Sequence, residues 1–329
     1  MSKGAKHPKV VLVGVWANRN WILGNWIREV KNRKPSHFSI RWTPFIYANR
    51  YPLEKILITP LPNSSTYFFS YPTIFRKYLS KNPTRFRQKS LVLYPHHEDE
   101  MGTIEEQVAL LNECFGVYFF CSRDADQLVT HGLRPEKVRL ALCGVDVDCV
   151  TTDVNSRREN TVVLASRFGP RKGLVILPEI VRALPSFKFV ALGRGWDQFI
   201  HESGLSNCRN FEHHSLDLES RKLHFSRASV FLSLSTLEGG PVPLIEAISL
   251  GCNVVATDTG FARDLIEDGV NGILLKNPPS VDEVVQALGK VGTLQSKPDV
   301  SWLTWDRITR MLLKDAYAIQ AHNHESTAR

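Results

Sequence analysis

Two hydrophobic patterns alternate along the chain. Short runs of consecutive apolar residues, typical of parallel strands buried on both faces, are followed by longer segments with apolar residues at helical spacing. Strands that alternate with helices predict right-handed crossovers and doubly wound parallel sheets, which is an α/β fold class. The clearest strand-like runs are Lys9–Val15, Ser90–Tyr94, Val117–Cys121, Thr161–Ala165, Lys188–Leu192, Val230–Leu234 and Asn253–Ala256.

A polar segment at residues 151–160 lacks large apolar side chains and divides this pattern in two. We therefore expect one domain over residues 1–150 and a second over residues 151–300, and a length of 329 residues suits two domains. Residues 35–89 contain seven prolines and predict no definite elements. Residues 301–320 have the apolar spacing of an amphipathic helix, and we expect disorder after residue 321.

The most specific motif lies between a predicted buried strand and a predicted helix. Gly239 and Gly240 allow the backbone to approach a ligand, and the helix start that follows, with Leu244, suits a phosphate. Glu246 lies one turn into this helix, where its carboxylate could accept hydrogen bonds from two adjacent ribose hydroxyls. Glu238, at the mouth of the loop, could contact a sugar. The alternative is a glycine turn flanked by two solvated glutamates.

A second motif follows the strand Thr161–Ala165. Arg167 offers a planar fork of donors and Lys172 a point charge, which together could bind a diphosphate. Gly193 lies in a short turn that ends the next predicted strand. Because ligands of open α/β sheets bind at the carboxyl ends of the strands, we expect these loops to share one site. The alternative is a solvated basic loop.

The segments SRFGPRKG, ALGRG, STLEGGPVPLIEAISLGCNVVATDTG and DLIEDGVNGILL resemble the donor-binding domain of family-four glycosyltransferases over about residues 130–290. These are retaining enzymes with the GT-B fold, in which two Rossmann-like domains face a cleft. The resemblance implies that Arg167 and Lys172 bind the donor diphosphate and that Glu246 binds the ribose. It also implies that Glu238, with the adjacent glycine backbone, contacts the transferred sugar, and that a C-terminal helix at about 301–320 packs back on the first domain.

Some positions depart from the family pattern. Phe261 stands in place of the second glycine of a pair, and Asp264 replaces a glutamate. In the first domain Gly24 is the candidate for a donor-site loop where the family has a glycine pair. The resemblance also implies an active-site histidine at the end of the strand Ser90–Tyr94, so His96 and His97 join Glu238 as catalytic candidates, and only one of the two is expected to face the cleft.

The other histidines and acidic residues are weaker candidates for a functional role. His213 and His214 are expected to be surface residues near the base pocket. The run of His96, His97, Glu98 and Asp99 makes poor joint metal ligands because its members are neighbours in sequence, so no metal and no cofactor are expected.

The charge is concentrated at the N-terminal end. The formal net charge of the chain is +8, but residues 1–97 hold 17 basic residues and two acidic ones. This excess predicts an anionic partner for the first domain. Residues 31–89 interleave basic and aromatic side chains, which would suit a solvated basic surface over an aromatic core or contact with an anionic membrane. Nucleic-acid binding uses the same residue types, but no known module accompanies them, so it is not expected.

The cysteines and the lengths of the apolar runs indicate the cellular compartment of the protein. The six cysteines form no C-x-x-C pair, and no apolar run is long enough for a signal peptide or a membrane span. We expect reduced thiols in a cytoplasmic protein that could attach peripherally to the inner face of a membrane.

These expectations combine into one functional hypothesis. The chain would be a retaining hexosyltransferase that moves a sugar from a nucleotide-diphosphate sugar, with UDP favoured, to a hydroxyl acceptor such as a lipid-linked or polysaccharide precursor. Two alternatives stay open: a GT-B sugar-nucleotide epimerase or hydrolase that needs no second substrate, and a non-catalytic protein that binds sugar nucleotides or membranes.

Overall fold

The computed structural model describes residues 7–15, 22–36, 38–45, 60–96, 101–145, 160–215 and 218–327. The chain divides into two compact units, which are described separately. Unit 1 comprises Met1–Gly144 and Leu303–Arg329, and unit 2 comprises Val145–Trp302. The sequence pattern had placed the corresponding boundaries at residues 150 and 300.

Unit 1 is built on a parallel sheet of six described strands in the order β2-β1-β3-β4-β5-β6. Apolar residues occupy successive positions of the central strands, so both faces of the sheet are buried, as in β4 where all five side chains are buried. The strands are β1 (Lys9–Val15), β2 (Ser39–Phe45), β3 (Thr66–Phe69), β4 (Ser90–Tyr94), β5 (Gly116–Phe119) and β6 (Val138–Leu140).

Helices follow these strands and cover the sheet. A capping box between Thr103 and Glu106 begins α4, and prolines at the first helical position begin α2 and α3. The helices of this part are α1 (Ile22–Arg33), α2 (Pro72–Lys81), α3 (Pro83–Phe86), α4 (Ile104–Leu111) and α5 (Ser122–Thr130).

The basic and aromatic stretch of residues 31–89 contributes much of the core of unit 1. Phe69, Tyr78 and Phe86 are buried. The distance between ring centroids is 5.4 Å for Phe69 and Tyr78 and 5.5 Å for Tyr78 and Phe86. These rings are therefore not available to stack on bases of a nucleic acid.

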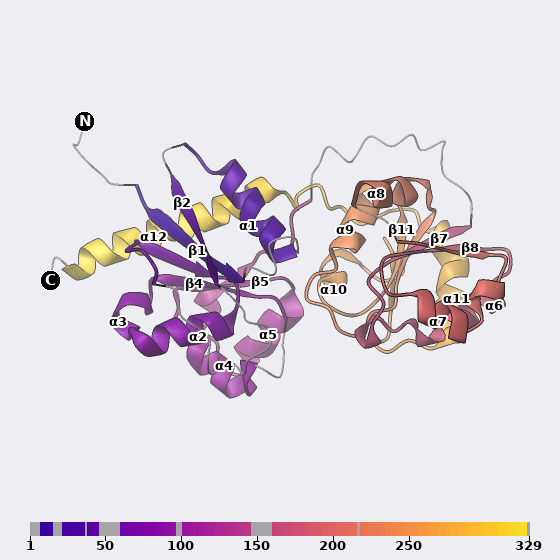
Figure 1. The fold of residues 1–329 in the computed structure, drawn as a ribbon, viewed down its shortest axis with the longest axis horizontal. Coiled ribbons are helices and arrows are strands. Elements are labelled where there is room, and N and C mark those ends of the chain that lie inside the picture. The colour runs from indigo at the N-terminus through magenta and orange to yellow at the C-terminus, as the bar shows by residue number, and fades with distance from the viewer. Residues whose placement is uncertain are drawn as a thin grey trace. The chain divides into compact units, whose positions relative to one another are not determined.

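The last helix, α12 (Trp305–Thr327), belongs to unit 1 and lies along α1 and β3 (Figure 1). Its buried Asp315 accepts hydrogen bonds from the Tyr118 hydroxyl at 2.7 Å and from Arg139 Nε at 3.0 Å. Arg307 donates to the backbone oxygens of Leu140 and Ala141, 2.9 and 3.0 Å away. The expected disorder after residue 321 is wrong, because the helix continues to Thr327.

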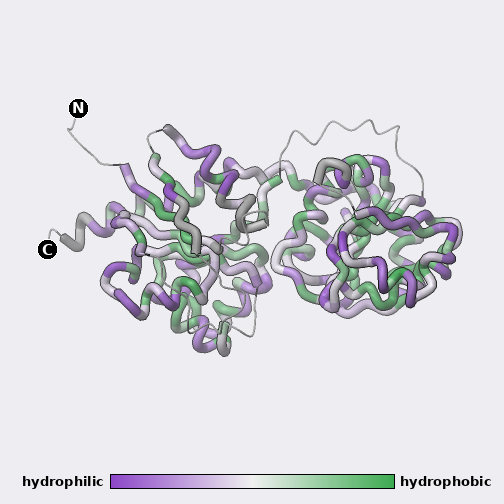
Figure 2. Tube along the Cα trace, viewed as in Figure 1, coloured by the Kyte–Doolittle hydropathy of each residue, from purple (hydrophilic) through white to green (hydrophobic). Residues whose placement is uncertain are grey.

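Unit 2 contains a second parallel sheet of six described strands, in the order β12-β11-β10-β7-β8-β9. Hydrophobic residues gather along the central strands, whereas the helices carry both hydrophobic and hydrophilic residues (Figure 2). Its strands are β7 (Thr161–Ala165), β8 (Lys188–Leu192), β9 (Phe211–His214), β10 (Val230–Ser233), β11 (Asn253–Thr257) and β12 (Ile273–Leu275).

The helices of unit 2 depart from the sequence pattern in two places. The segment after the Lys172 loop begins with a 3-10 turn, Leu174–Ile176, and α6 begins only after it, because Pro178 is tolerated only in a first helical turn. The polar stretch before β10 contains two helices and a strand that the hydrophobic pattern did not predict. The helices are α6 (Leu177–Ala183), α7 (Asp197–Glu202), α8 (Leu218–Arg227), α9 (Val242–Ser249), α10 (Ala262–Leu265) and α11 (Val281–Lys290).

Each sheet reverses its winding direction once. In unit 1 the reversal lies between β1 and β3, and in unit 2 it lies between β7 and β10. Ligands of open α/β sheets bind at such reversals, outside the carboxyl ends of the strands. The loop after β1, residues 16–21, lies outside the described residues, whereas the loops after β7 and β10 are described.

Candidate functional site

Three glycines fix the loops at the carboxyl ends of the unit 2 strands. Gly173, in the loop after β7, has a φ of +61°, and a Cβ there would overlap the backbone oxygen of Leu234 after β10. Gly193, at the end of β8, has a φ of +141°, and a Cβ there would overlap the Ser166 oxygen. Other residues rarely adopt these angles, so glycine permits the loop after β7 to pack directly against both neighbours.

The loops after β10 and β11 are joined in a similar way. Gly260 has a φ of +54°, and a Cβ there would lie 2.8 Å from the oxygen of Gly239. The backbone N–H of Glu238 donates to Thr259 Oγ1 at 3.0 Å, and Thr257 Oγ1 donates to the Ser235 oxygen at 2.7 Å. The motif around Glu238 is therefore held by threonines that the sequence did not mark, although both follow a strand that it did.

These loops bring Lys172 and Glu238 together although they are 66 positions apart in sequence. Lys172 Nζ donates to Glu238 Oε1 in an ion pair, with 24% and 16% of the side chains exposed. Arg167, in the same loop as Lys172, is exposed. The reversal between β7 and β10 thus carries two cations and one carboxylate, and their roles toward a diphosphate and a sugar stay predictions.

The start of α9 lies beside this ion pair. No side chain caps the helix, and Pro243 in its first turn brings no N–H. Gly239 and Gly240, which have no side chains, are buried, so this part of the loop consists of backbone alone. Leu244 differs from its expected role, because its side chain is fully buried and its N–H donates to the Pro241 oxygen at 2.8 Å.

Glu246, the candidate ribose ligand, is paired with a residue that the sequence reasoning missed. Arg221 Nη2, from α8, lies 2.7 and 2.9 Å from the two oxygens of the Glu246 carboxylate. The two side chains are 21% and 17% exposed. No sequence signal could have found this contact, since α8 lies in a polar stretch with no strong periodicity.

The end of β8 is tied to its other neighbour, β9. His213 Nε2 lies 2.8 Å from the Gly193 oxygen, and the Gly193 N–H donates to the His214 oxygen at 2.9 Å. Both histidines lie in the edge strand β9 and are partly buried, with 37% of the His214 side chain exposed. Gly193 therefore has the loop position that was predicted.

The candidates in unit 1 are less fully described. His96 lies two residues after the end of β4, behind Pro95, and is partly buried. His97 lies outside the described residues. Gly24 lies in the first turn of α1 and not in a loop, which corrects the prediction. A helix can begin before Gly24 because glycine costs only about 1 kcal/mol there relative to alanine.

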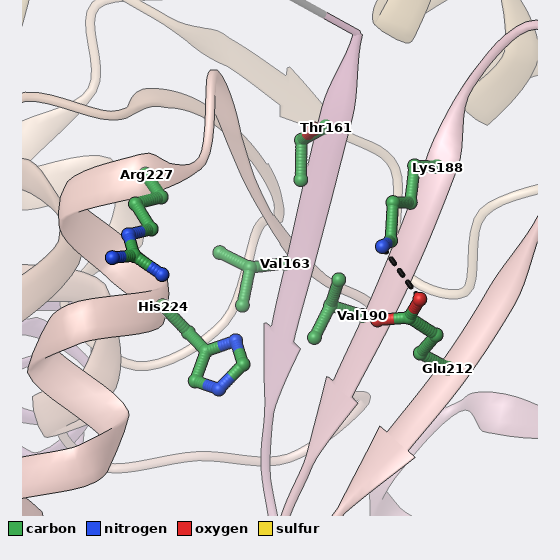
Figure 3. Close-up of a pocket in the computed structure, with 7 residues that line it drawn as sticks. All are labelled: Thr161, Val163, Lys188, Val190, Glu212, His224 and Arg227. Carbon is green, nitrogen blue, oxygen red and sulfur yellow. Dashed lines mark ion pairs between the residues drawn. The ribbon is translucent and has the colours of Figure 1, made fainter. Parts of the chain in front are cut away.

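A pocket also lies on a face of the unit 2 sheet, between α8 and the strands β7, β8 and β9 (Figure 3). Lys188 Nζ pairs with Glu212 Oε1 at 2.5 Å, which is the main reason that the pKa of Glu212 is lowered. None of the residues lining it was predicted as a site residue. They are Thr161, Val163, Lys188, Val190, Glu212, His224 and Arg227.

The described parts of the chain hold no metal-binding cluster, no membrane-spanning helix and no disulfide. Across them, three or more His, Cys, Asp or Glu residues do not gather as metal ligands. None of their helices combines the length and the apolar character needed to cross a membrane. The five cysteines that they include form no disulfide, and burial raises the pKa of Cys114 and Cys143 to about 12.

Comparison with known proteins addresses the family. Residues 153–300 match the family described as glycosyl transferases group 1. A phosphatidyl-myo-inositol mannosyltransferase from Mycobacterium tuberculosis is 28% identical over 167 residues, which are 46% of this chain and 44% of the relative. The chain thus aligns with less than half the length of this relative. The match confirms the resemblance to family-four glycosyltransferases over residues of unit 2.

Solved structures address the fold. A sucrose-phosphate synthase from Thermosynechococcus elongatus matches 98% of this chain and 100% of its own, with a TM-score of 0.69 and 14% identity. Anabaena HepE in complex with UDP-glucose matches 98% of this chain and 100% of its own, with a TM-score of 0.66 and 16% identity. These likenesses and the two parallel sheets confirm the prediction of the GT-B fold class.

Proposed function

We propose that this chain is a retaining glycosyltransferase that uses a nucleotide-diphosphate sugar, and that unit 2 binds the donor. The observation that carries the proposal is the placement of Lys172 and Glu238 at the loops where the unit 2 sheet reverses, with Glu246 one turn into α9, all within the residues that match the family. Open α/β sheets bind nucleotides at this place.

Each part of the donor substrate would then have a binding residue in unit 2. Lys172 and Arg167 would bind the diphosphate, and the buried backbone of Gly239 and Gly240 would lie close to it. Glu246 would accept hydrogen bonds from the ribose. Lys172 is paired with Glu238 in the structure, so donor binding would exchange this contact for one with the diphosphate and leave the Glu238 carboxylate for hydroxyls of the sugar.

The chemistry would be mainly electrostatic. Negative charge develops on the leaving diphosphate as the sugar–phosphate bond breaks, and fixed cations in a partly buried site stabilise that charge. Lys172, three-quarters buried, would take this role. The leaving phosphate would take the proton of the acceptor hydroxyl as the new bond forms on the same face of the sugar.

The finer assignments concern the donor base and the acceptor. UDP is proposed because a structure of similar fold is in complex with UDP-glucose. A lipid-linked or otherwise anionic acceptor is proposed because the basic excess lies on residues 1–97 and because one relative is a phosphatidyl-myo-inositol mannosyltransferase. Peripheral contact of unit 1 with an anionic membrane would follow from the same charge.

The test begins with the donor. Thermal unfolding with UDP, GDP, ADP and their sugars should show stabilisation by one nucleotide, since a ligand that binds only the folded state raises its stability. Transfer is then measured with that sugar nucleotide and candidate lipid acceptors. Lys172→Ala and Glu246→Ala should each lower turnover by at least about 100-fold while leaving the protein folded.

Lys290→Ala is the matched control, because Lys290 is an exposed cation of α11 in the same unit. Near-normal turnover of both site variants at saturating donor would contradict the proposal. Product analysis with donor alone separates the alternatives: an altered or hydrolysed sugar nucleotide would indicate an epimerase or hydrolase. Binding without any turnover would indicate a non-catalytic protein.

A further inference from the structure

Glu246 does not stand alone in the unit 2 site. Its carboxylate lies against Arg221, whose Nη2 is 2.7 Å from Oε2 and 2.9 Å from Oε1. The two residues come from α8 and α9, which lie beside each other (Figure 1). About four-fifths of each side chain is buried. One nitrogen therefore touches both oxygens of the group proposed to hold the ribose.

The position of Arg221 is set by its own helix. Its guanidinium carbon lies 5.8 Å from the centre of the Phe225 ring, one turn further along α8. Phe225 is fully buried and packs edge-on against Phe231 of β10, with ring centroids 5.7 Å apart. The Phe225 backbone oxygen accepts from Cys252 Sγ at 3.1 Å. The guanidinium thus rests on a ring that is anchored to the sheet.

The geometry leaves room for hydroxyl donors. A carboxylate oxygen carries two lone pairs, so a hydrogen bond from Nη2 does not saturate either oxygen. The cation also compensates the negative charge in a place where little water reaches it. A carboxylate held in one plane with both oxygens equally engaged can accept from two neighbouring hydroxyls at once, as a cis-diol requires.

We propose that Arg221 is the positioning residue for Glu246 and that the pair sets the preference of the donor site for a ribose over a deoxyribose. This inference rests on the proposed function, because it takes Glu246 as the ribose ligand. The competing role is structural: the ion pair would only join α8 to α9, and its loss would lower stability without changing which nucleotide is preferred.

The readout that separates the two roles is the ratio of two dissociation constants, that of 2′-deoxy-UDP to that of UDP. The same pair is measured with GDP and 2′-deoxy-GDP. Wild type should bind the ribonucleotide at least about tenfold more tightly, because a missing hydroxyl leaves a carboxylate acceptor unpaired. Arg221→Gln should weaken ribonucleotide binding about tenfold and bring the ratio below about three, since Glu246 is no longer held in place.

Two variants sharpen the measurement. Glu246→Gln should reduce the ratio to the same extent, and Arg221→Gln in that background should reduce it no further, because the two residues act as one unit. Arg227→Gln is the matched control: Arg227 is an exposed arginine on the same helix and should keep the wild-type ratio. Thermal unfolding of every variant reports any loss of stability separately.

The outcomes are distinct. An Arg221→Gln variant that unfolds at lower temperature but keeps the wild-type ratio overturns this inference and leaves the proposed function standing. A Glu246→Gln variant with the wild-type ratio overturns the ribose role of Glu246, and this inference with it. A wild type that binds none of the four nucleotides, and no ADP either, overturns the proposed function as well.

Discussion

At the scale of single residues, the candidate site depends on glycines that let backbones touch. Gly193 contacts the Ser166 oxygen from a φ of +141°, and Gly173 contacts Leu234 from a φ of +61°. Neither contact involves a side chain that could take part in chemistry. They matter because they fix the loop of Arg167 and Lys172 against the loop of Glu238.

Gly193→Ala should destabilise the protein by at least about 2 kcal/mol, because both the φ and the space exclude a Cβ. Urea unfolding measures this loss. Gly169→Ala is the control in the adjoining loop, since its φ of 174° is ordinary extended backbone and no atom lies within 4 Å of an added Cβ. A Gly193→Ala protein as stable as Gly169→Ala would contradict the described loop packing.

His224 allows a test of pH dependence. Burial first, and then the nearby His214 and Arg227, lower the pKa of His224 below its ordinary 6.5, while the facing Glu212 opposes this shift and Lys188 adds to it. The unfolded chain therefore takes up the proton more readily than the folded one. The resulting stability is present above pH 6.5 and is lost as the pH falls through the lowered pKa.

The unfolding temperature of wild type should thus fall more steeply than that of His224→Gln between about pH 7.5 and about pH 5.5. His201→Gln, at an exposed position of α7, should follow the wild-type slope. Parallel slopes for wild type and His224→Gln would show that His224 titrates alike in both states.

At the scale of helices and strands, the last helix completes unit 1 through a buried charge. Asp315 is 5% exposed and accepts from both Tyr118 and Arg139. Burial, and then the Asp315 carboxylate, raise the pKa of Tyr118 well above its usual value, so its hydroxyl remains a donor.

Asp315→Asn should lower the free energy of unfolding by about 2–4 kcal/mol, because Arg139 would keep its charge in a partly buried place without a counter-ion. Denaturant unfolding followed by the near-ultraviolet signal of unit 1 measures the change. Lys314→Gln is the control on the neighbouring, exposed position. Equal free energies of unfolding for the two variants would contradict this prediction and show that the ion pair of Asp315 and Arg139 does not stabilise unit 1.

The elements also show what the sequence could and could not predict. Continuous apolar runs such as Thr161–Ala165 predicted the central strands, because strands buried on both faces need no alternation. The strand β9 was missed because it lies at the edge of the sheet and its residues stay at least partly exposed. The helix α8 was missed because its sequence is polar and has little hydrophobic contrast. The contact of Arg221 with Glu246 was missed for the same reason: α8 gave no signal, so nothing placed its arginine.

At the scale of the whole molecule, the charge is divided between the units. The basic excess belongs to residues 1–97, and the aromatic side chains among them that the structure describes, such as Phe69 and Tyr78, are largely buried. Basic groups then remain at the surface, where Lys31 and Lys81 are exposed.

Binding to vesicles with roughly 30% phosphatidylserine should weaken at least about tenfold when Lys31 and Lys81 are both changed to glutamate, since each basic residue near such a surface contributes ~1 kcal/mol. Sedimentation with vesicles measures the binding, and added salt should weaken it for wild type. Changing Lys276 and Lys290, two exposed lysines of unit 2, is the matched control. Equal binding by both double variants would exclude unit 1 as the membrane-facing part.

The division into units has a consequence for folding. Unit 2 is one continuous segment, whereas unit 1 needs Leu303–Arg329 from the far end of the chain. A fragment of residues 145–302 should fold alone, and UDP at about 100 times its dissociation constant should stabilise it by about 2.7 kcal/mol. A chain ending at residue 302 should keep this transition and lose that of unit 1, because Tyr118 and Arg139 would be left without Asp315. Calorimetry of wild type, fragment and truncated chain measures both transitions. An intact unit 1 transition in the truncated chain would show that α12 covers the sheet without being needed to fold it.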